Sequence, residues 1–217
     1  MVRHELLVDS TAVIVVDMMN EFLEPGAIFE CQTGRAMVPL LSELLDICRS
    51  RKVPVIYTQM LHRADGSDWG WTARLGRARE AIHIEGTHEV AFYPAVAPQA
   101  GDIVISKRRF SAFYATELDL ILRRLGVNTL VITGVTSHVC CISTIRDALY
   151  RDYKVIYPQD LNECNDLPSV DGRLIPRQQV QDVIAGLIAL MCGEVTDGES
   201  LIRRVADAPR YLSELGR

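Results

Sequence analysis

The sequence lacks the features that mark a secreted, disulfide-rich or membrane protein. Its six cysteines show no CxxC spacing and no paired framework, and the N-terminal stretch MVRHELLVDS contains no apolar signal-peptide core. No uncharged apolar run approaches the roughly 20 residues that are needed to cross a bilayer. We therefore expect a protein of the reducing cytoplasm that has no membrane partner.

No Pro-, Gly- or Ser-rich linker, internal repeat or low-complexity segment interrupts the 217 residues, which predicts a single domain over residues 1–217. Hydrophobic residues are 48% of the chain and charged residues 24%, so one sizeable soluble core is expected. Basic residues are fewer than acidic ones, and the formal net charge is −5. This charge disfavours binding to nucleic acid and to anionic membrane surfaces. A small molecule remains the expected partner.

Short apolar runs alternate with segments of helical periodicity along the chain. The runs predict strands at Thr11–Val16, Val53–Thr58, Asp102–Ser106, Asn128–Thr133, Tyr153–Pro158 and Glu194–Thr196. The segments between them predict helices from about Arg35 to Arg51, from near Thr116, from the turn at Cys140 to Leu149, and from about Arg177 to Cys192. This alternation predicts an α/β fold, a three-layer α/β/α sandwich on a mainly parallel, Rossmann-like central sheet of about six strands.

Cys140 stands where the apolar run Asn128–Thr133 gives way to a helix. Gly134 is expected to stop the strand, and apolar residues then recur at helical spacing, with Cys140 in the first turn. A thiol at a helix start faces free backbone N–H groups and the positive end of the helix dipole, which favour thiolate. The same N–H groups can hold an oxyanion after sulfur attacks a carbonyl. The sequence therefore predicts that Cys140 is a nucleophile.

Two charged residues follow other predicted strands. Asp17 comes directly after one strand and Lys107 after another, and parallel strands bring their carboxyl ends to one edge of the sheet. Alone, Asp17 reads as a loop carboxylate and Lys107 as a solvated charge, but with Cys140 they form a complementary set. Asp17 can take the thiol proton and return it to a leaving amine, while Lys107 stabilises the thiolate. The predicted reaction is acyl or carbamoyl transfer to Cys140, followed by hydrolysis.

The long loop between Gln59 and Gly101 is expected to form a pocket wall. Tentative substrate contacts are aromatic residues of this loop and residues that flank the triad, although these side chains could equally serve packing; they are Asn20, Phe22, Trp69, Trp71 and Phe113. The loop also contains three histidines, His62, His83 and His88, whose spacing fits no common zinc pattern. They are predicted to be surface or loop histidines.

Three sequence blocks resemble those of a known family. VVDMMNEF, SKRRFSAFYATELD and TGVTSHVCCISTIRDA are similar to the DMQNDF, K-x-x-x-SAF-x-x-T-x-L and TG-x-x-T-x-x-C-V-x-x-T-x-x-DA blocks of the isochorismatase-like cysteine hydrolases. The resemblance runs from about Thr11 to Ile202. It implies an Asp17, Lys107 and Cys140 triad, a homodimer or homotetramer, and a cis peptide at Val135–Thr136. That bond would aim the Thr136 N–H, with the Cys140 N–H, at the oxyanion.

Within this family, the residues point to the metal-free amidohydrolase branch. Nicotinamidases carry an Asp-x-His metal motif and a second histidine, but here Met60 replaces the Asp and Ile82 the second histidine, while His62 remains. No metal and no cofactor are therefore expected. The resemblance implies cleavage of a linear C–N bond in carbamoyl or ureido compounds such as N-carbamoylsarcosine, biuret or ureidoacrylate. A nicotinamidase-type amidase is the alternative.

Cys141 stands where the family has valine, and two interpretations stay open. It is either a small buried apolar side chain or half of a redox sensor built on Cys140 and Cys141. A disulfide between adjacent cysteines closes a strained ring, and a helix start disfavours it. A third class, a catalytically dead binding module, does not explain why all three triad residue types are present.

Overall fold

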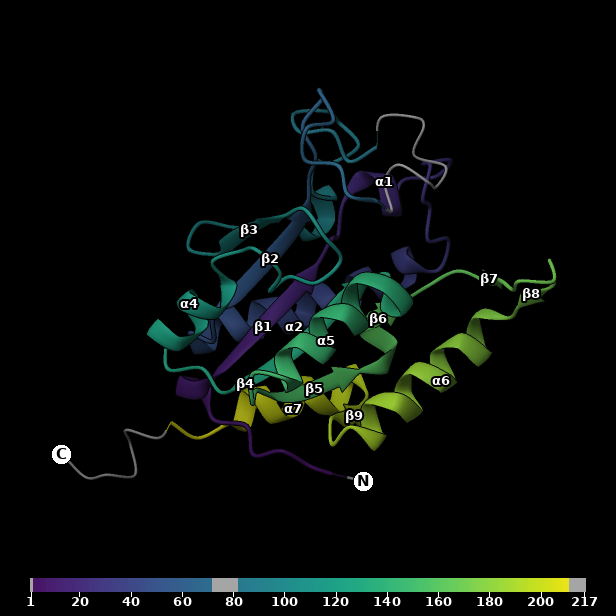
Figure 1. The fold of residues 1–217 in the computed structure, drawn as a ribbon. Coiled ribbons are helices and arrows are strands. Elements are labelled where there is room, and N and C mark those ends of the chain that lie inside the picture. The colour runs from purple at the N-terminus through teal and green to yellow at the C-terminus, as the bar shows by residue number, and fades with distance from the viewer. Residues whose placement is uncertain (1, 72–81, 211–217) are drawn as a thin grey trace.

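The computed structural model describes residues 2–71 and 82–210 (Figure 1). It shows a central sheet in the strand order β3-β2-β1-β4-β5-β9, with the short strand β6 paired to β4. The strands are β1 Thr11–Val16, β2 Val55–Met60, β3 Ile103–Lys107, β4 Thr129–Val135, β5 Lys154–Pro158, β6 Asn162–Glu163 and β9 Glu194–Thr196. All pairings of this sheet are parallel, which confirms the predicted α/β architecture.

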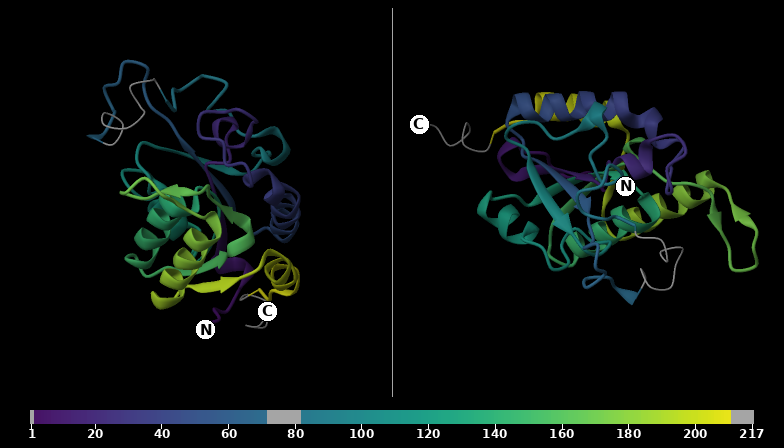
Figure 2. Two further views of the ribbon diagram at one scale, coloured as in Figure 1. Left: turned by 90° about the vertical axis from the view of Figure 1, so that its right-hand side faces the viewer. Right: turned by 90° about the horizontal axis from the view of Figure 1, so that it is seen from above.

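Helices cover both faces of the sheet. The helices are α1 Asn20–Leu23, α2 Val38–Arg51, α4 Leu118–Arg124, α5 Ile142–Leu149, α6 Arg177–Leu190 and α7 Gly198–Asp207. Helices α2 and α7 lie together on one face, and α4, α5 and α6 lie on the other (Figure 2). The resulting three layers explain why β1 and β4 are buried at every position, since neither face of these central strands meets water. No described helix is long and apolar enough to span a membrane.

Strand β4 passes through Gly134 instead of ending there, which corrects the sequence expectation. Gly134 pairs with Val16 of β1 at φ +118°, and a Cβ at this position would lie 2.1 Å from the Val16 carbonyl oxygen. A residue with a side chain cannot adopt this geometry without moving β1. The glycine therefore permits a close approach of two central strands immediately before Asp17 and the Val135–Thr136 bond.

Two elements near the C-terminal part of the chain were not predicted. Helix α7 begins after Asp197, whose carboxylate accepts a hydrogen bond from the Ser200 N–H at 2.7 Å, and it buries Leu201 and Val205. A small antiparallel hairpin, β7 Leu167–Pro168 and β8 Leu174–Ile175, precedes α6. The α7 pattern, with Leu201 and Val205 four residues apart after a capping Asp197, is present in the sequence, whereas the two hairpin strands have two residues each and give no periodic signal.

Candidate active site

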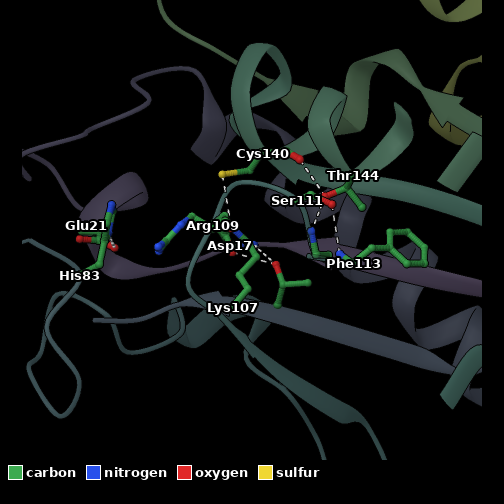
Figure 3. A network of polar contacts seen from close by, with 11 residues as sticks. Asp17, Glu21, His83, Lys107, Arg109, Ser111, Phe113, Cys140 and Thr144 are labelled. Carbon is green, nitrogen blue, oxygen red and sulfur yellow. Dashed lines mark hydrogen bonds and ion pairs between the residues drawn. The ribbon is translucent and has the colours of Figure 1, made fainter. Parts of the chain in front are cut away.

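The three predicted triad residues come together at the carboxyl edge of the sheet (Figure 3). Asp17 follows β1 with φ +49°, and the Thr58 hydroxyl of β2 donates to its Oδ1 at 2.8 Å. Lys107 is the last residue of β3, and Cys140 lies in a π-helical turn, Ser137–Cys141, which leads into α5. The carboxyl ends of three different strands thus place a carboxylate, an amine and a thiol close together.

Lys107 contacts both of the other residues. Its Nζ lies 2.8 Å from Asp17 Oδ2 and 3.4 Å from Cys140 Sγ, and it also donates to the Arg109 carbonyl oxygen at 3.2 Å. The exposed fractions are 0% for Asp17, 0% for Lys107 and 4% for Cys140. The ammonium therefore has an acceptor for each of its three protons and sits between a carboxylate and a sulfur, almost without water.

Burial dominates the electrostatics of the cluster. Desolvation would lower the pKa of Lys107, but the Asp17 carboxylate and the Cys140 sulfur raise it above its ordinary value, so the amine is charged. Burial raises the pKa of the Cys140 thiol to about 12, and Lys107 offsets this only in part while Asp17 adds to it. The burial of Cys140 thus acts against the thiolate that the helix start was expected to favour, and Lys107 acts for it.

Hydrogen bonds hold the turn that carries Cys140. The Thr144 hydroxyl donates to the Cys140 carbonyl oxygen at 2.8 Å and accepts from the Ala112 N–H at 3.0 Å, which ties α5 to the segment that follows β3. Thr136 precedes the turn, and its carbonyl oxygen accepts from the backbone N–H of Val139 at 3.1 Å. Thr144 was not predicted as a functional residue, although it lies in the third sequence block, four residues after Cys140.

The Val135–Thr136 peptide bond is cis, at the position implied by the family resemblance. Thr136 and Cys140 both line a cavity of about 620 Å³. The described lining also includes Phe22, Met60, His83, Phe110, His138, Asn165 and Asp166. A small substrate in this cavity would meet the nucleophile at its wall. Of these seven residues, Phe22 alone was predicted as part of the site.

Phe22 is the one tentative substrate contact that lines this cavity; the other four do not. Asn20 points elsewhere and donates to the His88 carbonyl oxygen at 3.0 Å. The Trp69 indole donates to a carbonyl within its own loop at 3.2 Å, and Trp71 is 72% exposed. These side chains are engaged by the loop or by solvent, so they do not form the pocket wall that the sequence suggested.

Phe113 is also a packing residue. Its ring lies 5.8 Å from that of Tyr153 and 5.0 Å from the Arg151 guanidinium carbon, and it is buried. Figure 3 shows Phe113 on one side of Cys140 and the Glu21 and His83 side chains on the other. Phe110, three residues earlier in the chain, lines the cavity instead.

The three histidines lie in the loop between β2 and β3, in line with the prediction of surface or loop residues, but two of them are not at the surface. His62 and His83 are buried, and only His88 is exposed. Desolvation lowers the pKa of His62, whose Nδ1 lies 3.5 Å from Asp68 Oδ1. Among the residues that the structure describes, no three His, Cys, Asp or Glu side chains are placed to hold a metal ion.

Cys141 is fully buried behind the nucleophile. Burial raises the pKa of its thiol well above the ordinary value, and all six cysteines are free thiols. A buried thiol with this environment is a poor nucleophile and a poor metal ligand. The structure thus favours the packing interpretation of Cys141.

The chain is similar to known proteins in sequence and in fold. The sequence pattern of the Isochorismatase domain matches residues 11–173. The chain is 33% identical over 172 residues to "Ureidoacrylate amidohydrolase RutB" of Azorhizobium caulinodans, covering 70% of this chain and 76% of that protein. It is 31% identical over 153 residues to "N-carbamoylsarcosine amidase" of Arthrobacter sp, and the match covers 69% of this chain and 58% of that protein. A solved cysteine hydrolase from Pseudomonas syringae pv. phaseolicola 1448A superposes with a TM-score of 0.91 and 36% identity. The match covers 94% of this chain and 96% of that chain.

Proposed function

Because this chain belongs to the isochorismatase family, we propose that it is a cysteine amidohydrolase, which cleaves a linear C–N bond of a small carbamoyl, ureido or carboxamide compound and releases ammonia. The observation that carries this proposal is the contact of Lys107 with both Asp17 and Cys140 at the wall of a cavity. The two relatives named above support the substrate class, because the compounds in both names contain a carbamoyl group.

The first half of the reaction forms a covalent intermediate. Asp17 takes the Sγ proton as Cys140 Sγ attacks the carbonyl carbon of the substrate. The Thr136 and Cys140 backbone N–H groups serve as donors to the resulting oxyanion. The tetrahedral adduct collapses when the C–N bond breaks, and Asp17 gives its proton to the leaving ammonia. A thiocarbamate or thioester remains on Cys140.

The second half restores the enzyme. A water molecule attacks the carbonyl carbon of the intermediate, Asp17 takes a proton from that water, and the C–S bond breaks. Sulfur leaves as thiolate and recovers its proton from Asp17. Lys107 stays protonated throughout, because its raised pKa keeps it charged, and it stabilises both the Asp17 carboxylate and the transient thiolate.

Ammonia release from a panel of ureido and amide compounds tests the proposal. Cys140→Ala should abolish turnover, whereas Cys192→Ser, at an exposed cysteine, should leave it unchanged. Mass spectrometry of the acid-quenched enzyme should show a substrate adduct on the Cys140 peptide. Turnover above a tenth of wild type in Cys140→Ala would refute the assignment of the nucleophile.

The same panel decides between the alternatives. It contains nicotinamide, and nicotinamide hydrolysis that depends on a metal would favour a nicotinamidase-type amidase. A reversible Cys140–Cys141 disulfide in the absence of any hydrolysis would favour the redox sensor.

A homodimer or homotetramer in the cytoplasm is part of our proposal, and sedimentation of the purified protein measures its oligomeric state.

A further inference from the structure

Apolar side chains form much of the described lining of the cavity that contains Cys140, and two of them are exposed to solvent. Phe110 and Ile28 both line this cavity, with exposed fractions of 37% and 43%. The hydrolysis described above uses the triad and two backbone N–H groups, so it gives neither residue a role. A large apolar side chain that meets water inside a cavity marks a place where a ligand can bury apolar surface.

Phe110 is held close to the triad by its position in the chain. It comes three residues after Lys107, whose Nζ donates to the Arg109 carbonyl oxygen at 3.2 Å. On the other side of Phe110, the Ser111 hydroxyl donates to the Asp147 carboxylate of α5. Figure 3 shows Arg109 and Ser111, the two chain neighbours of Phe110, beside the triad. The backbone is therefore fixed on both sides of a ring that shares its cavity with the nucleophile.

Ile28 lies in the segment that follows α1, and backbone hydrogen bonds hold both of its neighbours. The Ala27 N–H donates to the Glu24 carbonyl oxygen at 3.2 Å, and the Phe29 N–H donates to the Glu21 carbonyl oxygen at 3.1 Å. These bonds fix the backbone but do not bury the Ile28 side chain. The segment thus presents an apolar group to the cavity in a defined position.

Three stacked rings form a further part of the same lining. The Phe29 ring centroid lies 5.8 Å from that of Phe22 and 5.2 Å from that of His83, with interplanar angles of 29° and 24°. The Glu21 carboxylate holds the end of the stack, since its Oε1 lies 2.6 Å from His83 Nδ1. An aromatic wall that is ordered before a ligand arrives can bind an apolar group at a low cost in conformational entropy.

Several polar side chains of the described lining already have partners within the protein. Glu30 pairs with Arg35 at 2.7 Å, and Asn165 Nδ2 donates to the Glu30 carbonyl oxygen at 2.6 Å. The Asp166 carboxylate accepts from the Arg177 backbone N–H at 2.7 Å. A ligand that used these groups would compete with existing contacts, whereas the exposed apolar side chains would only exchange water for ligand.

We propose that the substrate carries an apolar group, aromatic or branched aliphatic, beside its carbamoyl or carboxamide group, and that Phe110 and Ile28 bind this apolar group. The two residues determine specificity and take no part in the proton transfers. This inference rests on the proposed hydrolase function, because it names the substrate class of the same cavity. It concerns the apolar group alone, so a substrate that also carries a carboxylate fits it equally well.

Two pairs of compounds that differ only in an apolar group test the inference. The first pair is methylurea and benzylurea, and the second is N-carbamoylglycine and racemic N-carbamoylphenylalanine, which both keep a carboxylate. Burial of a phenyl ring favours binding by roughly ten- to hundredfold, so kcat/KM should be at least about tenfold higher for the aromatic member of a pair. A smaller advantage in every pair that the enzyme hydrolyses would overturn the inference.

Phe110→Ala should raise KM for the aromatic member about tenfold, with kcat within about threefold of wild type and KM for the small member within about twofold. Ile28→Ala should act in the same direction by about threefold, because the aliphatic side chain is smaller. Phe110→Leu keeps a large apolar side chain and should retain most of the wild-type preference. The matched control is Tyr114→Ala, at an aromatic residue of the same segment that is 59% exposed and lies outside the described lining. It should leave both members of each pair unaffected.

Two outcomes in the variants contradict the role of Phe110. An equal rise in KM for the aromatic and the small member would mean that Phe110→Ala only distorts the cavity. A large fall in kcat at unchanged KM would mean that Phe110 acts in the chemical step. Circular dichroism and thermal unfolding of each variant establish that it folds.

Calorimetric binding to Cys140→Ala separates this inference from the proposed function. If wild type hydrolyses none of the compounds and Cys140 takes up no adduct, the hydrolase proposal fails. Binding to Cys140→Ala still reports the preference in that case, and benzylurea should bind at least about tenfold more tightly than methylurea. Equal binding of the two ureas, or binding of neither, overturns the apolar substrate class.

Discussion

Removal of the Lys107 charge should damage stability and activity together, whereas removal of both buried charges should damage activity alone. Lys107→Met deletes the ammonium that lies 2.8 Å from Asp17 Oδ2, in a cluster with no exposure of either side chain. Asp17 then remains as a buried charge without its ammonium partner, while the Thr58 hydroxyl still donates to its Oδ1. Asp17→Asn combined with Lys107→Met removes that charge, and asparagine tolerates the positive φ at this position.

The magnitudes follow from burial. Loss of one partner of a fully buried ion pair costs about 3–5 kcal/mol, which lowers Tm by about 10 °C for a chain of this size. Replacement of both partners by uncharged side chains changes stability little, so the free energy of unfolding of the double variant should lie within about 2 kcal/mol of the wild-type value. Both variants should lose at least about a thousandfold in kcat/KM, because each lacks a group that the proton transfers require.

The pH dependence has a defined sign. The folded-state pKa of Lys107 is raised above its ordinary 10.5, so its contribution to wild-type stability is fully present below that value and is lost only as the pH rises further. The stability deficit of Lys107→Met relative to wild type should therefore be the same at pH 7 and at pH 9, because the Lys107 charge of wild type is fully present at both.

Urea unfolding at both pH values and ammonia release at pH 8 provide the measurements. A double variant as unstable as Lys107→Met would refute the argument, because the loss would then come from packing and not from an unpaired charge. A Lys107→Met enzyme with near wild-type kcat would remove Lys107 from the mechanism.

Four further predictions concern the surroundings of the triad. Thr144→Val removes the hydroxyl that joins the Cys140 carbonyl oxygen to the Ala112 N–H, and should lower kcat about tenfold at unchanged KM, as steady-state kinetics will show. Gly134→Ala should destabilise the fold by at least about 2 kcal/mol more than Gly126→Ala in urea unfolding, since both have positive φ but only Gly134 faces backbone within 3 Å. Cys141→Val should retain activity, and its resistance to mild peroxide should match that of wild type. Cys140→Ser should be inactive, because Asp17 is too weak a base to activate a hydroxyl. Loss of function in Cys141→Val would support the redox sensor. Chelator treatment should leave the rate of ammonia release unchanged, and stoichiometric zinc whose removal abolishes activity would contradict this.

The sequence by itself determined the features that depend on local pattern. Buried strands are continuous apolar runs, so most of the succession of strands and helices along the chain could be read directly. The places of Asp17, Lys107 and Cys140 at the carboxyl ends of three different strands could be read in the same way. Parallel strands end at one edge, which is why contact between these three residues could be expected from their places in the chain. The three sequence blocks also sufficed to indicate the family that the comparisons show.

Only the tertiary structure decided what surrounds each of these side chains. The raised pKa of Cys140 comes from burial, which depends on how elements distant in the sequence close over the thiol. Phe110 lines the cavity whereas Phe113 packs on Tyr153, and the sequence signal for two neighbouring phenylalanines is the same. His83 meets Glu21 only because a long loop folds back onto α1. The succession of strands and helices along the chain follows from periodicity. Desolvation, ion pairing and cavity shape are sums over contacts between remote residues, and these contacts exist only once the chain has folded.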